Sequence, residues 1–127
     1  MDDRRQVRVL DSGSSCPTLP MVDGVGTARA VVWPGVGAEL RSMIRISLDP
    51  SARTVELRHP VEAVYYVMAG TGSAVDPGTS ARQPLLEGSM VHIEPGTPYR
   101  FAAGPQGLEI LGGPCPADRE IFERIGT

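Results

Sequence analysis

The sequence contains neither lysine nor asparagine, and its 127 residues include only two histidines and two cysteines. The absence of lysine excludes a lysine Schiff base and the lysine of a phosphate-binding P-loop. The two cysteines, Cys16 and Cys115, are too few for a disulfide-stapled scaffold. We therefore expect a protein that works in a reducing compartment and does not depend on disulfide bonds.

Acidic residues outnumber basic ones, 15 to 12, and all 12 basic residues are arginine. The net charge of −3 and the isoelectric point near 5.3 argue against nucleic-acid binding. No apolar run approaches the roughly 20 residues of a membrane-spanning helix. The first residues, MDDRRQVRV, lack the apolar stretch of a secretory signal. These features predict no nucleic-acid partner, no membrane association and a cytoplasmic location.

Turn-forming residues are abundant, with 15 glycines and 12 prolines, and hydrophobic residues make up 41% of the chain, enough for one core. Short β-branched runs lie between these breaks, every 8–12 residues in much of the chain, which is typical of a sandwich or barrel. The length fits a single domain. The expected strands are residues 6–10, 29–33, 40–48, 54–58, 64–68, 72–75, 90–93, 99–102 and 108–111.

The end of the chain has a different pattern, which predicts a short helix. Asp118 fits the first helical turn, and three apolar residues share one face. These three residues are Ile121, Phe122 and Ile125. We therefore divide the chain into an N-terminal strand and arm over 1–27, a β-barrel over 28–115 and a C-terminal helix over 116–127.

Two segments carry a resemblance to a known family. The first is LRHPVEAVYYVMAG, residues 57–70, and the second is GSMVHIEPGTPYRF, residues 88–101. They resemble the paired motifs of the cupin superfamily, and the likeness is strongest at framework glycines and prolines such as Gly70, Gly88 and Pro95. The resemblance implies an all-β double-stranded β-helix, the cupin jelly-roll barrel, with a short C-terminal helix. It also implies a homodimer.

The same resemblance marks where cupins hold a metal, and here this sequence departs from the family. Leu57, His59, Ala63 and Tyr99 occupy the four ligand positions, so only one ligand type is kept. A site for Fe, Mn or Zn needs three or four converging donors. The comparison therefore implies no cofactor, and the alternative is a divalent metal held by His59 with Glu62.

His59 and Tyr99 are the candidate catalytic pair. An inward-facing histidine is either an acid/base group or an orienting hydrogen-bond partner, and otherwise a core residue bonded to a neighbour. The Tyr99 phenol is expected either to donate to a substrate carbonyl or enolate, or to fill space in the wall.

Strand alternation selects further residues for the barrel interior. Tyr65 shares the parity of Ala63, so Tyr66 is expected to face outward, as is His92. Arg45 most simply faces solvent, and in the alternative it clamps an anion in the lumen. The expected ligand-binding residues are Leu57, Ala63, Tyr65, Glu62, Ile93 and Arg45.

Three functions remain open for this sequence. The first is a metal-independent enzyme of small-molecule or specialised metabolism, of isomerase, dehydratase or cyclase type, with acid/base residues in the lumen. The second is a non-catalytic ligand-binding or sensory protein. The third is a metal-dependent hydrolase or oxygenase with a reduced ligand set. Leu57, Ala63 and Tyr99 at the ligand positions favour the first two, and all three take a small molecule as partner.

Overall fold

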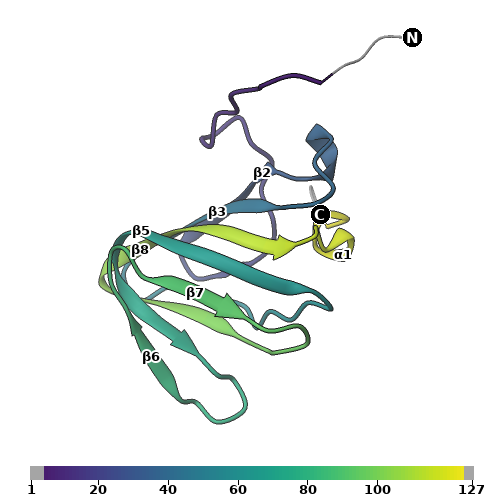
Figure 1. The fold of residues 1–127 in the computed structure, drawn as a ribbon. Helices are drawn as coiled ribbons and strands as arrows, with labels where there is room; N and C mark the ends of the chain where they lie inside the picture. Colours follow the sequence, from purple (N-terminus) through teal and green to yellow (C-terminus); the bar gives the residue numbers. More distant parts are fainter. Residues whose placement is uncertain (1–4, 125–127) are drawn as a thin grey trace.

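The computed structural model describes residues 5–124 as a nearly closed antiparallel β-barrel with a short helix at its C-terminal end (Figure 1). Every strand pairing is antiparallel. The strands are β1 (Val22–Asp23), β2 (Gly26–Val32), β3 (Met43–Leu48), β4 (Arg53–Thr54), β5 (Glu62–Val75), β6 (Arg82–Leu85), β7 (Met90–Ile93) and β8 (Arg100–Cys115). A 3-10 turn, η1 (Pro34–Val36), follows β2, and the helix α1 spans Arg119–Phe122.

Two long strands, β5 and β8, pair with each other along most of their length and connect the two halves of the barrel. The first part of β5 also pairs with β7, and its last part pairs with β6. The register shifts near Gly70, which has a positive φ of 85°. A Cβ there would lie 2.1 Å from the carbonyl oxygen of Gly107, so glycine allows this close approach.

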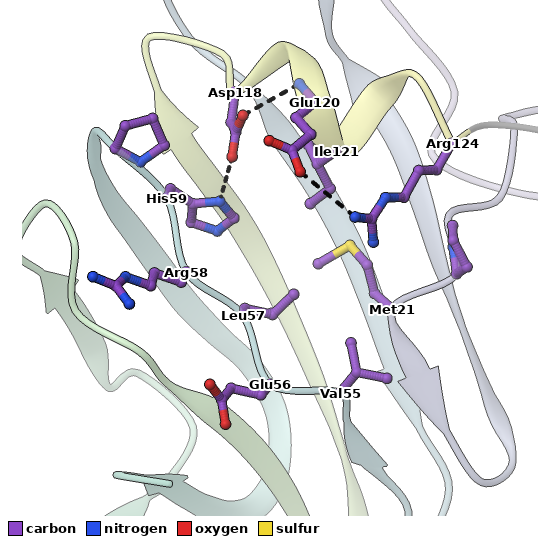
Figure 2. A pocket seen from close by; sticks show the side chains of 12 residues that line it. Met21, Val55, Glu56, Leu57, Arg58, His59, Asp118, Glu120, Ile121 and Arg124 are labelled. Atoms are coloured by element: carbon purple, nitrogen blue, oxygen red, sulfur yellow. Dashed lines mark hydrogen bonds and ion pairs between the residues drawn. The ribbon is translucent and has the colours of Figure 1, made fainter. Parts of the chain in front are cut away.

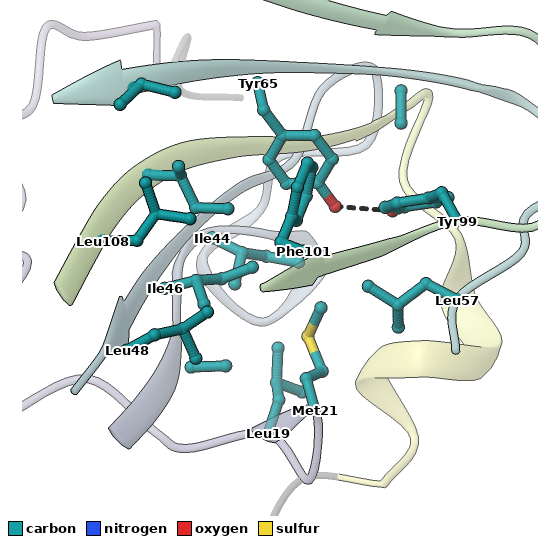
Figure 3. Close-up of a cluster of buried hydrophobic side chains, with 14 of the residues drawn as sticks. Leu19, Met21, Ile44, Ile46, Leu48, Leu57, Tyr65, Tyr99, Phe101 and Leu108 are labelled. Carbon is teal, nitrogen blue, oxygen red and sulfur yellow. Dashed lines mark hydrogen bonds between the residues drawn. The ribbon is translucent and has the colours of Figure 1, made fainter. Parts of the chain in front are cut away.

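The core lies between the two halves and is built from alternate residues of the strands (Figure 3). On β3, Ile44, Ile46 and Leu48 are buried while the residues between them are partly exposed. Tyr65 of β5 and Phe101 of β8 are the largest fully buried side chains. Burial of each such side chain contributes roughly 1.5–3 kcal/mol, so this packing fixes the positions of the polar groups in the interior.

The helix α1 is held against the barrel by an aromatic contact and an ion pair. The rings of Trp33 and Phe122 stack at 5.7 Å, and Arg119 pairs with Glu39. Asp118 caps the helix, since its Oδ1 accepts a hydrogen bond from the backbone N–H of Glu120. The predicted helix is therefore present but short, and Ile125 lies outside the described residues.

Most of the predicted strands are present with different extents, but of the strand predicted over 54–58 only Thr54 lies in a strand, β4. Residues 64–68 and 72–75 form one strand, β5, and residues 100–102 and 108–111 both belong to β8, which begins directly after Tyr99. The strand β6 was not predicted. Its sequence, RQPL, has little β-branched character and is recruited by pairing with the end of β5.

The predicted strand over residues 6–10 is wrong. These residues are extended without ladder partners, and Val7 and Val9 are each 96% exposed. Alternation of apolar and polar residues was the only signal, and alternation cannot create a neighbouring strand. The first strand is β1, and β2 begins at Gly26, so the sheet starts before residue 28. No helix among residues 5–124 is long and apolar enough to cross a membrane.

Candidate active site

The two predicted catalytic residues are brought together by a backbone bridge. Leu57 and Tyr99 form an isolated antiparallel bridge, with reciprocal N–H···O bonds of 2.8 and 2.9 Å. The turn before Tyr99 is tied to the same segment, since the N–H of Gly96 donates to the carbonyl of His59 at 2.7 Å. These bonds hold the His59 and Tyr99 side chains beside one another inside the barrel.

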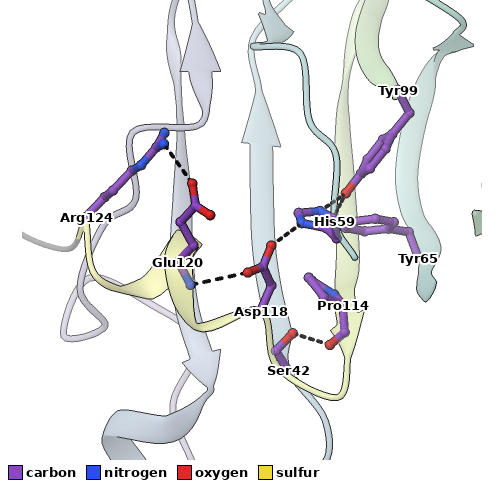
Figure 4. A network of polar contacts seen from close by, with 8 residues as sticks. All are labelled: Ser42, His59, Tyr65, Tyr99, Pro114, Asp118, Glu120 and Arg124. Carbon is purple, nitrogen blue, oxygen red and sulfur yellow. Dashed lines mark hydrogen bonds and ion pairs between the residues drawn. The ribbon is translucent and has the colours of Figure 1, made fainter. Parts of the chain in front are cut away.

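Four side chains then form a continuous line of hydrogen bonds, which we call the polar relay (Figure 4). Oδ2 of Asp118 lies 2.8 Å from Nδ1 of His59. Nε2 of His59 lies 2.7 Å from the phenolic oxygen of Tyr99, and that oxygen lies 2.7 Å from the phenolic oxygen of Tyr65. The polar relay thus connects the cap of α1 with the interior of β5.

The proton positions in the polar relay follow from its donors and acceptors. A carboxylate only accepts, so His59 donates from Nδ1 to Asp118 and its Nε2 is left as an acceptor. Tyr99 therefore donates to Nε2, and its oxygen accepts from the hydroxyl of Tyr65. One lone pair of the Tyr99 oxygen remains available for a further partner.

The polar relay is almost dry. His59 is 4% exposed and Tyr99 5%, while Tyr65 is fully buried; the Asp118 side chain is 12% exposed. Phe101 packs edge-on against both tyrosine rings, at 4.8 and 5.5 Å. Rings packed this way cannot rotate freely, so the hydroxyl positions are set by the core.

Burial changes the acidity of both phenols. Burial raises the pKa of Tyr65 above its ordinary value, with a smaller opposite effect from its hydrogen bond to Tyr99. Burial also raises the pKa of Tyr99, and the neighbouring Tyr65 and the charge of Asp118 raise it further. Both phenols are therefore neutral near pH 7, and Tyr99 is a hydrogen-bond donor rather than a phenolate in the resting protein.

Asp118 is the member of the polar relay that the sequence did not lead us to expect beside His59. The helix-start pattern accounts for its cap role, through Oδ1, but its other oxygen binds a histidine 59 positions earlier in the chain. The signal that was available is a carboxylate at a helix start in a chain with one inward-facing histidine. A carboxylate on Nδ1 fixes the tautomer and orientation of an imidazole, which is a common requirement of acid/base histidines.

Two separate hollows lie on either side of the polar relay. A pocket of 330 Å³ is lined by Tyr99 together with the end of β5, part of β6 and β7, and the loop before Tyr99. A groove of 240 Å³ lies between residues 55–60 and α1, where His59 and Asp118 line it (Figure 2). We call them the Tyr99 pocket and the α1 groove.

The remaining predicted ligand residues are divided between the interior and the outer surface. Leu57, Ala63, Tyr65 and Ile93 are buried, and Ile93 lines the Tyr99 pocket while Leu57 lines the α1 groove. As the alternation predicted, Tyr66 is 44% exposed and His92 is exposed as well.

Glu62 and Arg45 are not brought to the site. Glu62 binds Nε2 of the exposed His92 at 3.0 Å, because it immediately precedes the inward-facing Ala63 and faces the opposite side. Arg45 lies on the outer side of β3, since its neighbours Ile44 and Ile46 take the inner side, and it pairs with Glu109 at 3.3 Å.

The residues at the cupin ligand positions do not fit a metal ion. His59 is the only nitrogen donor among them, and both of its ring nitrogens are engaged, by Asp118 and Tyr99. Within residues 5–124, no three side chains of His, Cys, Asp or Glu gather in a way that could hold a metal ion. The Glu62 carboxylate is bound to His92 instead of joining His59.

Comparison with solved structures identifies the fold. The chain is similar to a cupin-like protein from Thermotoga maritima MSB8, with a TM-score of 0.68, 20% identity and 99% of both chains covered. It is similar to a predicted oxalate decarboxylase from Thermotoga maritima, with a TM-score of 0.68, 18% identity, and 87% of this chain and all of the other covered. The chain is also similar to the polyketide cyclase RemF from Streptomyces resistomycificus, with a TM-score of 0.63 and 23% identity. That match covers 91% of this chain and 80% of the other.

No family model and no curated protein matches the sequence. The structural likeness nevertheless shows that the chain has the cupin fold, the double-stranded β-helix predicted from the paired motifs.

Proposed function

We propose that this chain is a metal-independent cupin enzyme that binds a small molecule in the Tyr99 pocket and catalyses proton transfer, in an isomerase, dehydratase or cyclase type of reaction. The observation that carries the proposal is the unbroken line of hydrogen bonds from Asp118 through His59 to Tyr99. It resembles the arrangement in which a carboxylate orients a histidine and the histidine activates a hydroxyl.

The Tyr99 pocket is the better substrate site of the two hollows. In the α1 groove a ligand meets His59 only at ring carbons, because both nitrogens are already bonded. Tyr99 lines the other pocket and keeps a free lone pair on its oxygen. The volume of 330 Å³ lies within the range of small-molecule pockets.

The proton transfer follows from the order of donors and acceptors. As Tyr99 passes its proton to Nε2 of His59, its oxygen takes a proton from a carbon or hydroxyl of the substrate. Asp118 stabilises the imidazolium that forms. The reverse transfer returns a proton to a different substrate atom for isomerisation, or to a departing hydroxyl for dehydration, which leaves as water.

Burial makes this transfer concerted. Because burial raises the pKa of Tyr99, a free phenolate in this position is strongly disfavoured. The proton must therefore move to His59 while the substrate supplies another. Tyr65, whose hydroxyl is hydrogen-bonded to the Tyr99 oxygen, keeps that oxygen oriented toward His59.

The test uses chelator-treated protein and a panel of hydroxy-ketones and linear polyketones in D₂O, with mass spectrometry to detect deuterium uptake and new products. We expect conversion of at least one compound without added metal. Tyr99→Phe and His59→Gln should each reduce the rate by about 10²-fold or more. Tyr66→Phe, which changes an exposed tyrosine that does not line the Tyr99 pocket, is the matched control and should retain the rate.

Two results would contradict the proposal. One is a rate that survives both the Tyr99 and the His59 substitution. The other is a rate that disappears with chelator and returns with a transition metal. Binding of a panel compound without any conversion would instead identify the non-catalytic ligand-binding alternative.

A further inference from the structure

The charges around the Tyr99 pocket are unevenly distributed. The ionisable side chains that project from its lining residues, Tyr99 apart, are the carboxylates of Asp76 and Glu94 and the imidazole of His92. The His92 ring is already bound to the Glu62 carboxylate. No arginine lines this pocket, and the chain has no lysine. The pocket therefore lacks a side chain that could neutralise a bound anion.

Apolar side chains form part of the walls of the same pocket. Val91 and Ile93 of β7 contribute one side, and Val75 at the end of β5 contributes another. Both carboxylates belong to exposed residues, so they lie where the pocket meets solvent rather than against the buried tyrosine. Asp76 is held by the N–H of Gly78, at 2.9 Å, in the turn after β5.

We propose that the Tyr99 pocket selects uncharged molecules that carry a carbonyl or hydroxyl group, and that Glu94 disfavours carboxylate substrates. A carboxylate moved into these walls would lose its water without gaining a cation, which is costly. The nearby Glu94 carboxylate would add repulsion, modest in size because it is exposed and screened. An uncharged carbonyl has neither penalty, and two residues that line the pocket, Tyr99 and Thr97, carry hydroxyl groups.

A cation is a poorer fit than an uncharged molecule, although the rim is acidic. The exposed carboxylates attract a cation only weakly through solvent. The apolar walls would remove the water of an ammonium group as they would that of a carboxylate. This selectivity rests on the proposed function only in using the same pocket, since it concerns binding and not proton transfer.

The experiment compares three probes that share one naphthalene ring: acetylnaphthalene, naphthoate and aminomethylnaphthalene. Dissociation constants are measured by NMR, with the methyl signals of Val91 and Ile93 reporting that binding occurs in this pocket. We expect acetylnaphthalene to bind at least about tenfold more tightly than naphthoate, because the carboxylate is desolvated without a partner. Tighter binding of either charged probe, or no binding of acetylnaphthalene, would overturn the proposal.

Two substitutions test the electrostatic cause. Glu94→Gln should tighten naphthoate binding by about threefold and leave acetylnaphthalene unchanged. Glu56→Gln, which removes a carboxylate from the α1 groove instead, is its matched control. Gln83→Arg places a guanidinium in the lining and should raise naphthoate affinity by about tenfold, whereas Gln106→Arg, outside this pocket, should not.

The outcomes separate this inference from the proposed function. If acetylnaphthalene is preferred but Tyr99→Phe leaves the reaction rate unchanged, the selectivity stands and the catalytic proposal fails. If Tyr99→Phe abolishes the reaction but naphthoate binds as tightly as acetylnaphthalene, the catalytic proposal stands and the selectivity is wrong.

Discussion

The phenolic oxygen of Tyr99 lies 2.7 Å from Nε2 of His59, a residue 40 positions earlier in the chain. The Leu57–Tyr99 backbone bridge fixes this contact, and Asp118 completes it from the other side of the ring. At the positions where cupin motifs carry metal ligands, this chain thus has a hydrogen-bonded histidine–tyrosine pair. The buried polar groups of the site partner one another.

Asp118 is predicted to act by positioning His59. Asp118→Asn keeps the size of the side chain but removes the charge that stabilises an imidazolium, so the reaction rate should fall by about 10²-fold or more. The pH profile of the rate should change with it, which a purely structural role would not cause. Glu120→Gln changes a neighbouring exposed carboxylate and should leave rate and profile unchanged. A D118N protein with the wild-type rate and pH profile would show that Asp118 only caps α1.

The two tyrosines of the polar relay are predicted to differ in their effect on stability. Tyr99→Phe leaves both Nε2 of His59 and the hydroxyl of Tyr65 without a partner, and should cost about 2–4 kcal/mol of unfolding free energy. Tyr65→Phe leaves the Tyr99–His59 bond intact and should cost about 1 kcal/mol. Chemical denaturation measures both. Equal losses would mean that the Tyr99 hydroxyl does not bind both His59 and Tyr65.

Alkaline pH is predicted to destabilise the protein through the same tyrosines. Because burial raises the pKa of Tyr65 and Tyr99 in the folded state, only the unfolded chain releases their protons just above pH 10. The folded state then binds more protons, and stability falls as pH rises, by about 1.4 kcal/mol per pH unit for each tyrosine. Below that pH their contribution is fully present.

This pH dependence is measured by denaturation between pH 9 and 12, a range that spans the ordinary tyrosine pKa of about 10. The Tyr65→Phe and Tyr99→Phe variants should each have a shallower slope than the wild type. Phenolate absorbance that develops before unfolding should be the same in wild type and variants, because the buried phenols do not contribute to it. A slope that the substitutions leave unchanged would contradict the assigned direction.

Two glycines with similar positive φ values allow backbone strain to be separated from steric clash. Gly70 and Gly88 have φ values of 85° and 93°, but a Cβ on Gly70 would meet the Gly107 carbonyl at 2.1 Å, whereas nothing lies within 4 Å of one on Gly88. Gly88→Ala should cost about 1–2 kcal/mol from backbone strain alone. Gly70→Ala should cost clearly more, since the β5–β8 pairing must also shift. Thermal unfolding of both variants gives the comparison, and equal losses would exclude the steric explanation.

Part of this site could be predicted from the sequence because it depends on local patterns. Alternation along one strand is sufficient to place Tyr65 inside and Tyr66 outside, and likewise to place Ile93 inside and His92 outside. The framework glycines and prolines around these strands located the barrel, and with it the positions of His59 and Tyr99.

The rest depends on contacts that no local pattern encodes. The carboxylate of Asp118 reaches His59 because α1 lies beside residues 55–60. The periodicity of a helix predicts which face is apolar, but it does not predict which segment that helix packs against. Residues 6–10 were predicted as a strand because apolar and polar residues alternate there. No strand lies beside them to form a ladder, so they are not part of the sheet. The RQPL sequence of β6 carries almost no strand signal of its own, and tertiary pairing overrides its weak propensity.

The most direct test of the account is the protonation state of His59, measured by long-range ¹H–¹⁵N NMR on chelator-treated protein. We expect the proton on Nδ1, beside the Asp118 carboxylate, and an unprotonated Nε2, with signals that stay unchanged when zinc is added. A proton on Nε2, or a shift of either nitrogen on addition of stoichiometric zinc, would contradict a metal-independent Asp118–His59–Tyr99 site.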